Sequence, residues 1–404
     1  MDYTLIFYNK YISKISVKGR LYMQNLSRRN FFKLSASIVA GATLFDLTGI
    51  NHKVFAQANV PQKFKFVPVY LDKLPSAIES VNNSELVHNA YNYILNSVQK
   101  IDNPTLRNQT LYLINNTTPS FMQLYTSTSA ITNIYNQLAD NGLINPSIIS
   151  PEQLFPLLKN KIQHFLSAPG SGYASHHAYP GGLCTHVAAN LAISEGIINT
   201  YQLIFGYAVN NDIVLSAQAL HDLAKPWVFQ WNAAGSCLKE YTIANTGAHH
   251  ILGLVESIYR DLPADEIIAQ ACAHNHPGSD KDEQDVVGWL KAAALIAQKN
   301  PVKYGLLDKS GERLPIPQHQ EGYIVHLGDH DWVLSGIAAK NIVLYLQEIA
   351  KNDYNFSDKD LTGKRFNDFR NYIGAQVSFM YLHNLMAQNG LEDVKRLVQQ
   401  IILK

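Results

Sequence analysis

Residues 219–227 read ALHDLAKPW, with His221 and Asp222 adjacent at the end of an apolar run and Lys225 three positions further on. Imidazole and carboxylate groups are both ligands of borderline and hard divalent ions. Consecutive residues on a helix point about 100° apart, so the two side chains can hold one ion near the helix surface. The segment therefore predicts a metal-binding position where a helix leaves the core.

Histidines are concentrated around this pair. The chain contains 15 histidines, and twelve of them lie between positions 164 and 330. Several occupy expected helix starts, ends or faces with apolar neighbours, which predicts one or two ions at the crossing of four or five helices. The further candidate ligands are His186, His249, His274 and Asp329, with His250, His276 and His177 as additional candidates and Asp331 as a rival to Asp329.

The order H…HD…H…H…D resembles the HD-domain superfamily of metal-dependent phosphohydrolases. HHAYPGGLCTH ends at His186 and is followed after about 35 residues by ALHDLAKPW, which is similar to the opening pattern of that family, Gly181-Gly182 included. The resemblance covers about 160–340. It implies a mostly α-helical bundle and the metal ligands His186, His221, Asp222, His249, His274 and Asp329.

The resemblance also implies a reaction. The extra histidines favour two ions, from Mn, Fe, Ni, Co or Mg, whose bound hydroxide would cleave a phosphoester. Asp222 is expected to bridge the ions because a carboxylate has two oxygens. Lys225 matches a family lysine and could pair with a substrate phosphate. A lysine favoured by the helix dipole is the alternative explanation for Lys225.

One difference from the family pattern argues against one class of substrate. No GYP triplet follows the late histidines, where the sequence reads HNHPGSD, and this argues against the cyclic-dinucleotide phosphodiesterase branch. Two other functions stay open. The same ligand order resembles di-iron oxygenases of the inositol-oxygenase type, and a non-catalytic helical domain could keep the metal for structure.

Charge and cysteine content exclude other classes. Residues 1–58 carry eight Lys/Arg against two Asp/Glu, so the remaining chain has 25 basic and 30 acidic residues, a balance of −5. A mildly acidic body has no electrostatic footprint for nucleic acid. The three cysteines are scattered and form no C-x-x-C pair, so no disulfide framework or thiolate zinc site is expected. The expected substrate is a small phosphorylated molecule.

The basic N-terminal segment is typical of an export signal. LSRRNFFK precedes the short apolar run LSASIVAGATLF, and VFAQA ends in a cleavage site at Ala58. The pair Arg28-Arg29 resembles a bacterial twin-arginine signal, which implies the twin-arginine export machinery as partner and a periplasmic protein. The apolar run is too short to span a membrane, so no stable span is expected after cleavage. Met23 is a candidate for the true start.

The apolar spacing predicts a mostly α-helical fold, with one β-hairpin carrying Trp227 and Trp231 and no βαβ pattern. The expected division is an export signal (1–58), an N-terminal helical region (59–155), the metal-binding domain (156–350) and C-terminal helices (351–404). Expected helices are 75–100, capped by Ser76 with Glu79, 104–115, 119–140, 151–167, 183–209, 213–225, 246–260, 263–274, 282–299, 321–351, 366–388 and 391–402.

Overall fold

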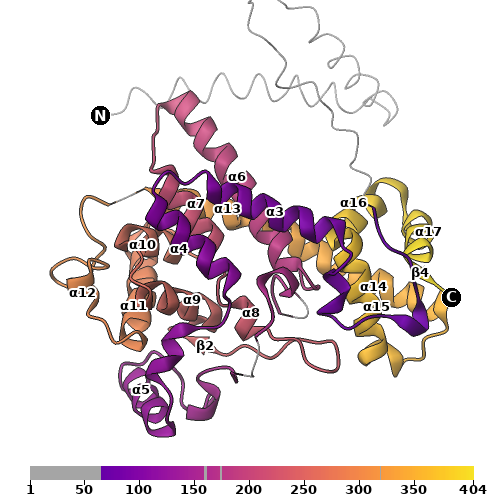
Figure 1. Cartoon of the computed structure of the whole chain (residues 1–404), viewed down its shortest axis with the longest axis horizontal. Helices are drawn as coiled ribbons and strands as arrows, with labels where there is room; N and C mark the ends of the chain where they lie inside the picture. The colour runs from indigo at the N-terminus through magenta and orange to yellow at the C-terminus, as the bar shows by residue number, and fades with distance from the viewer. Residues whose placement is uncertain (1–64, 159–161, 173–174, 319) are drawn as a thin grey trace, which may run out of the picture. The chain divides into compact units, whose positions relative to one another are not determined.

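The computed structural model of the chain describes residues 65–158, 162–172, 175–318 and 320–404 (Figure 1). The chain divides into two units, Met1–Lys63 and Phe64–Lys404, and the second contains these residues. The predicted export signal lies outside the described residues. Within them the fold is mostly α-helical, as predicted, and the named strands form only two two-stranded pairs.

The N-terminal helices begin where short polar side chains cap them. These helices are α3 (Glu85–Gln99), α4 (Pro104–Asn115) and α5 (Thr128–Asp140). Ser84, Asn103 and Ser127 accept hydrogen bonds from backbone N–H groups of the first turns. The predicted start of the first helix near Ser76 is therefore wrong: Ser76 and Glu79 do bond each other, but only the 3-10 turn Glu79–Val81 follows.

The helix predicted over 151–167 is also wrong. The described part of this segment holds only the 3-10 turns Pro151–Gln153 and Phe165–Ser167. Pro156 has no N–H to donate and disfavours helical backbone in the residue before it. Phe155 instead stacks on Trp227, with ring centroids 6.3 Å apart. Trp227 lies in the short helix α8 (Lys225–Val228) in the core, not on a hairpin.

The central helices are packed by direct helix-to-helix contact. Helix α6 contacts α3, α7 and α13. The cap of α7 is Asn210, and Asp212 in its first turn accepts from the backbone N–H groups of Asp102 and Asn103 at the start of α4. The helices of this part are α6 (Gly182–Phe205), α7 (Asn211–Leu220), α9 (Ala248–Tyr259), α10 (Ala264–Ala271), α11 (Asp280–Ile296), α12 (Pro301–Tyr304) and α13 (Glu321–Gly328).

The helix predicted over 321–351 is interrupted. Helix α13 ends at Gly328, the 3-10 turn Asp329–Asp331 follows, and α14 (Trp332–Tyr354) resumes the helix. A Cβ atom on Gly328 would lie 2.0 Å from the Ser194 hydroxyl of α6, so only glycine allows this close approach. The turn therefore presents its acidic residues toward α6.

The C-terminal helices gather around a second hydrophobic cluster, at the yellow end of the chain in Figure 1. The predicted helix 366–388 is divided at Ser378, whose φ of +60° is left-handed, into α15 (Lys364–Val377) and α16 (Phe379–Asn389). Helix α17 (Leu391–Ile401) leads into β4 (Ile402–Leu403), which pairs in parallel with β1 (Val69–Tyr70). The first hydrophobic cluster contains residues from Val81 to Val325. It therefore includes residues on both sides of position 155, where the predicted N-terminal region ends.

In place of the predicted hairpin, the structure has an isolated β-bridge and one pair of two-residue strands. Trp231 and Cys237 form an isolated antiparallel bridge, and β2 (Thr242–Ile243) pairs antiparallel with β3 (Thr246–Gly247) directly before α9. One helical run in the described residues, Glu321–Tyr354, is long and apolar enough to cross a membrane by length and composition alone. A single run of this kind is weak evidence for a span, because core helices of soluble proteins meet the same criteria.

Candidate metal centre

Elements from five parts of the sequence bring the predicted ligands to one place. His186 lies on the first turns of α6, the His221-Asp222 pair directly follows α7, and His249 lies at the start of α9. All four side chains are buried. His274, in the turn after α10, and Asp329, in the turn after α13, complete the group.

Asp222 lies between two sets of imidazoles. Its Oδ2 atom is 3.1 Å from Nε2 of His186 and 3.2 Å from Nε2 of His221. Its Oδ1 atom is 3.3 Å from Nε2 of His249 and 3.6 Å from Nε2 of His274. This is the position that a carboxylate bridging two ions would occupy.

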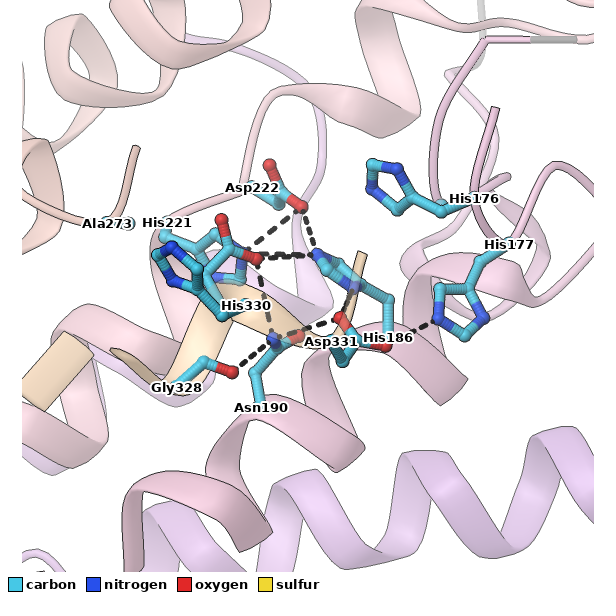
Figure 2. Close-up of polar contacts among 12 residues, drawn as sticks. His176, His177, His186, Asn190, His221, Asp222, Ala273, Gly328, His330 and Asp331 are labelled. Carbon is cyan, nitrogen blue, oxygen red and sulfur yellow. Dashed lines mark hydrogen bonds and ion pairs between the residues drawn. The ribbon is translucent and has the colours of Figure 1, made fainter. Parts of the chain in front are cut away.

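Asp329 faces the same centre from the turn after α13. Its Oδ1 atom lies 3.1 Å from Nε2 of His186 and 3.3 Å from Nε2 of His221, and its Oδ2 atom lies 3.7 Å from Nε2 of His274. Asp331, its rival, contacts the other edge of the His186 ring (Figure 2). The structure therefore separates the two aspartates by the imidazole nitrogen that each one faces.

Three of the imidazoles have an acceptor at Nδ1. A neutral imidazole that donates from Nδ1 carries its lone pair on Nε2. In all three rings that lone pair then points to the Asp222 and Asp329 side of the centre. The Nδ1 contacts are His186 to Asp331 Oδ1 at 3.1 Å, His221 to the Gln218 carbonyl at 2.8 Å and His249 to Glu240 Oε1 at 2.5 Å.

The centre thus brings acceptors together with few protons between them. Nε2 of His186 and Nε2 of His221 are only 3.4 Å apart. Both oxygens of Asp222 are buried and have no hydrogen-bond partner within the described residues, while the imidazoles and the Lys225 ammonium approach them as close ion pairs. A cation satisfies such a set of imidazole and carboxylate donors, and these groups fit borderline divalent ions. Several His/Asp groups here could therefore hold metal ions.

The pKa shifts reflect the same crowding. Burial opposes the ionised form of Asp222, but His221 and Lys225 outweigh it and hold the pKa of Asp222 well below its usual value. Burial likewise opposes protonation of His221, yet the carboxylates of Asp222 and Asp329 raise its pKa to about 9. The carboxylates around His186 hold its pKa well above the ordinary value despite its burial. Positive charge is thus strongly favoured at this point.

Histidines farther from the carboxylates are held neutral. Burial lowers the pKa of His274 to about 4. Burial, with the positive charge of Lys225 second, lowers the pKa of His176 to about 2. The pKa of His250 is held well below its usual value by burial and by His274. Neutral imidazoles are the form that binds a metal ion.

The three additional candidates differ in position. His250 joins a group with Asp222, His249 and His274 that could hold an ion, and its ring stacks on His274. His177 contacts Asp331 at 2.8 Å instead of Asp222 or Asp329. His276 is outside the potential ligand groups found among the described residues, and its Nδ1 accepts from the Gly278 N–H.

Lys225 is buried in the centre. Its ammonium lies 2.5 Å from Oδ2 of Asp222 and donates to the Gly170 carbonyl at 2.5 Å. A cavity of about 420 Å³ adjoins it, and this cavity also reaches the ligand side chains. The remaining residues around the cavity include Ser171, Ser175, His176, Thr246, Trp289, His326, His330 and Trp332. Trp231 is not among these residues, and its indole N–H donates to the Ser167 carbonyl.

Sequence reasoning missed the partners of the ligands. Glu240, which follows the β-bridge between Trp231 and Cys237, contacts Nδ1 of His249. Asn190, one turn after His186, donates to the Gly328 carbonyl at 2.7 Å. The spacing of His186 and Asn190 on one helix face was a usable signal for Asn190. Glu240 had none, because its contact depends on how the segment before β2 folds back.

A comparison with known proteins gives a partial relative. Over 100 residues the chain is 29% identical to the dihydroneopterin 2′,3′-cyclic phosphate phosphodiesterase of Methanocaldococcus jannaschii. The match covers 25% of this chain and 39% of that protein, so the chain spans well under two-thirds of its length. No protein-family model and no solved structure matches the chain. The comparison links part of the chain to a phosphodiesterase, in accord with a metal-dependent phosphohydrolase.

Proposed function

We propose that this protein is an HD-type metal-dependent phosphohydrolase that cleaves a phosphoester of a small molecule. The observation that carries the proposal is the set of Nε2 lone pairs and carboxylate oxygens facing one another around Asp222. Acceptors at these distances repel each other unless positive charge lies between them, and the raised pKa values of His186 and His221 reflect the same preference. The similarity of part of the chain to a phosphodiesterase supports hydrolysis as the use of that cation.

The ligands divide into two half-sites that share Asp222. His186, His221 and Asp329 would hold an ion on the Oδ2 side of Asp222, and His249 with His274 would hold one on the Oδ1 side. His250 is a further ligand candidate on the second side. Bound divalent ions lower the pKa of water and polarise a phosphoryl oxygen.

Lys225 adds a charge beside these half-sites. It lies in the wall of the cavity and its ammonium is held by a backbone carbonyl and by Asp222. A phosphoryl oxygen entering the cavity could replace the Gly170 carbonyl as acceptor. We assign Lys225 to orienting the phosphoryl group and Asp222 to joining the half-sites.

The test combines metal analysis with a phosphoester panel. The purified full-length protein is analysed for bound metal and then assayed with Mn²⁺, Fe²⁺, Co²⁺, Ni²⁺ or Mg²⁺ on phosphomonoesters, phosphodiesters and 2′,3′-cyclic phosphates. His221→Ala and Asp222→Ala should each lose metal and activity. His88→Ala is the matched control, because His88 lies on α3 and contacts the Asn82 carbonyl.

Each competing function has its own result. Unchanged metal content in both His221→Ala and Asp222→Ala would show that the site assignment is wrong. Two bound irons with a visible absorption band and O₂ uptake, without phosphoester cleavage, would favour the oxygenase. Bound metal without turnover in either assay would favour a structural role for the ion.

We further propose that the protein is exported to the periplasm by the twin-arginine machinery. The support is the sequence of residues 24–58, which lie outside the described residues. N-terminal sequencing of periplasmic protein should begin at Asn59, and Arg28→Lys with Arg29→Lys should keep the chain in the cytoplasm. A periplasmic double variant, or a mature chain that retains Arg28, contradicts the proposal.

A further inference from the structure

We propose that His177 and Asp331 form a positioning pair that fixes the ring of His186 and thereby sets the metal affinity of its half-site. The inference rests on the metal binding of the proposed function and concerns residues that bind no ion themselves. It also gives a role to the HHAYPGG loop.

The carboxylate of Asp331 is shared between two imidazoles. Its Oδ1 atom is 3.1 Å from Nδ1 of His186, and its Oδ2 atom is 2.8 Å from Nε2 of His177 (Figure 2). Nε2 of His186 faces Asp222 on the opposite side of the ring. Asp331 therefore fixes the tautomer and rotation of His186 from the edge that does not face the ion, and His177 fixes Asp331.

The loop is built to hold His177 in an unusual conformation. His177 has a φ of +49°, in the left-handed region that residues with a side chain seldom adopt. Its carbonyl accepts from the Gly170 N–H at 2.9 Å. A Cβ on Gly182 would lie 1.8 Å from that carbonyl oxygen, and a Cβ on Gly170 would lie 2.5 Å from Cβ of His177. Strained backbone that its surroundings enforce is typical of functional positions.

The alternative is a third ion between His177, His186 and Asp331, which are close enough to hold one. That ion would have to bind Nδ1 of His186 while Nε2 of the same ring faces the main centre, so His186 would lose its proton altogether. Hydrogen bonds from both imidazoles to Asp331 require no such loss. Metal-binding histidines commonly donate their other N–H to a carboxylate, and losing that partner weakens metal binding about 10–100-fold.

The experiment measures Co²⁺ binding to the metal-free full-length protein by competition with a chelator. The variants are Asp331→Asn, His177→Phe and His177→Gln, and His88→Phe is the control outside the centre. Asp331→Asn and His177→Phe should keep the number of Co²⁺ ions per chain and weaken the tightest dissociation constant about 10–100-fold. His177→Gln, whose amide N–H can still donate to Asp331, should recover part of the affinity.

Other outcomes overturn the inference in distinguishable ways. One Co²⁺ fewer per chain, with unchanged affinity for the rest, would indicate a third ion. Wild-type affinity in both Asp331→Asn and His177→Phe would show that the pair does not position His186. A wild-type protein that binds no Co²⁺ or other divalent ion contradicts the proposed function itself. Should His177→Phe fail to fold, Tyr179→Phe removes the 3.3 Å contact at Nδ1 of His177 and should weaken binding in the same direction.

Discussion

The surroundings of Lys225 in the structure decide between the two explanations that the sequence offers for this residue. Both sequence explanations place it at a helix end, either for the dipole or for a phosphate. In the structure it is buried, begins α8 and lies 2.5 Å from Oδ2 of Asp222. A lysine at the first position of a helix gains nothing from the dipole, because cations are favoured at the opposite end. Its contact with Asp222 and the cavity therefore accounts for it better.

Replacing Lys225 with Met should separate substrate contact from metal binding. The loss of one hydrogen bond to a charged group costs about 1.5–3 kcal/mol, which corresponds to roughly a 10–100-fold lower kcat/KM on a phosphoester that the proposed activity assay identifies as substrate. Metal content should stay at the wild-type level. Lys291, which is partly exposed and paired with Glu312, supplies the control Lys291→Met. Loss of metal in Lys225→Met would instead assign the lysine to holding Asp222.

Close backbone contacts between helices and loops determine where the candidate ligands lie. The start of α6 fits against the loop residues Gly170 and His177 only because Gly182 lacks a side chain. The same helix contains Gly196, where an added Cβ would meet nothing within 4 Å. These two glycines allow opposite predictions within one helix.

Gly182→Ala should lower the free energy of unfolding by roughly 3 kcal/mol or more, because its Cβ overlaps the His177 carbonyl. Gly196→Ala should raise it by about 0.5–1 kcal/mol, since alanine lowers the entropy cost of an exposed helix position. Urea unfolding of both variants measures the difference. Equal effects at the two positions would mean that the loop does not pack on α6 as described.

Helix α10 packs on α7 through a buried acid. Glu266 is fully buried, accepts from the Ser216 hydroxyl at 3.0 Å, and its Oε2 has no hydrogen-bond partner within the described residues. Burial raises its pKa to about 8, although the Ser216 hydrogen bond acts in the other direction. The folded protein therefore keeps a proton at pH 7 that the unfolded chain releases.

This proton predicts a pH dependence of stability. Because the pKa of Glu266 is higher in the folded state, its contribution is complete below about pH 4.5 and is lost as the pH rises to about 8. Between these values Glu266 should lower the free energy of unfolding by about 1.4 kcal/mol per pH unit. Glu266→Gln cannot titrate, so urea unfolding at pH 5, 6.5 and 8 should show a flatter profile. Parallel profiles for wild type and variant would refute the assignment.

For the described unit as a whole, the candidate centre joins helices that are distant in the sequence. Its ligands come from α6, from the turns after α7, α10 and α13, and from the start of α9. The first strand of the unit, β1, pairs with its last strand, β4, so the two ends of the described chain are held together. An ion bound at the centre would therefore connect elements that unfolding separates, and only the folded state brings the candidate ligands together.

Metal binding should consequently stabilise the whole unit. A ligand that binds only the folded state at 100 times its Kd adds about 2.7 kcal/mol to the free energy of unfolding. Thermal unfolding with added Mn²⁺ should therefore give a higher Tm than unfolding in EDTA. The shift should vanish in His221→Ala and persist in His88→Ala. An equal shift in His221→Ala would place the stabilising ion elsewhere.

Sequence patterns alone predicted the fold class, most helices and the residues that meet at the candidate centre. Helical periodicity and caps are local, and the ligand chemistry of histidine and aspartate belongs to the residue types. Packing between distant elements, which no local pattern encodes, places Asp331 at the far edge of His186, Glu240 against His249 and the break of the long helix at Asp329. His186 and Asp331 are 145 positions apart, and no local pattern specifies which ring edge a residue at that separation faces. Packing of α13 against α6 specifies it, through a glycine whose role appears only when the two helices touch.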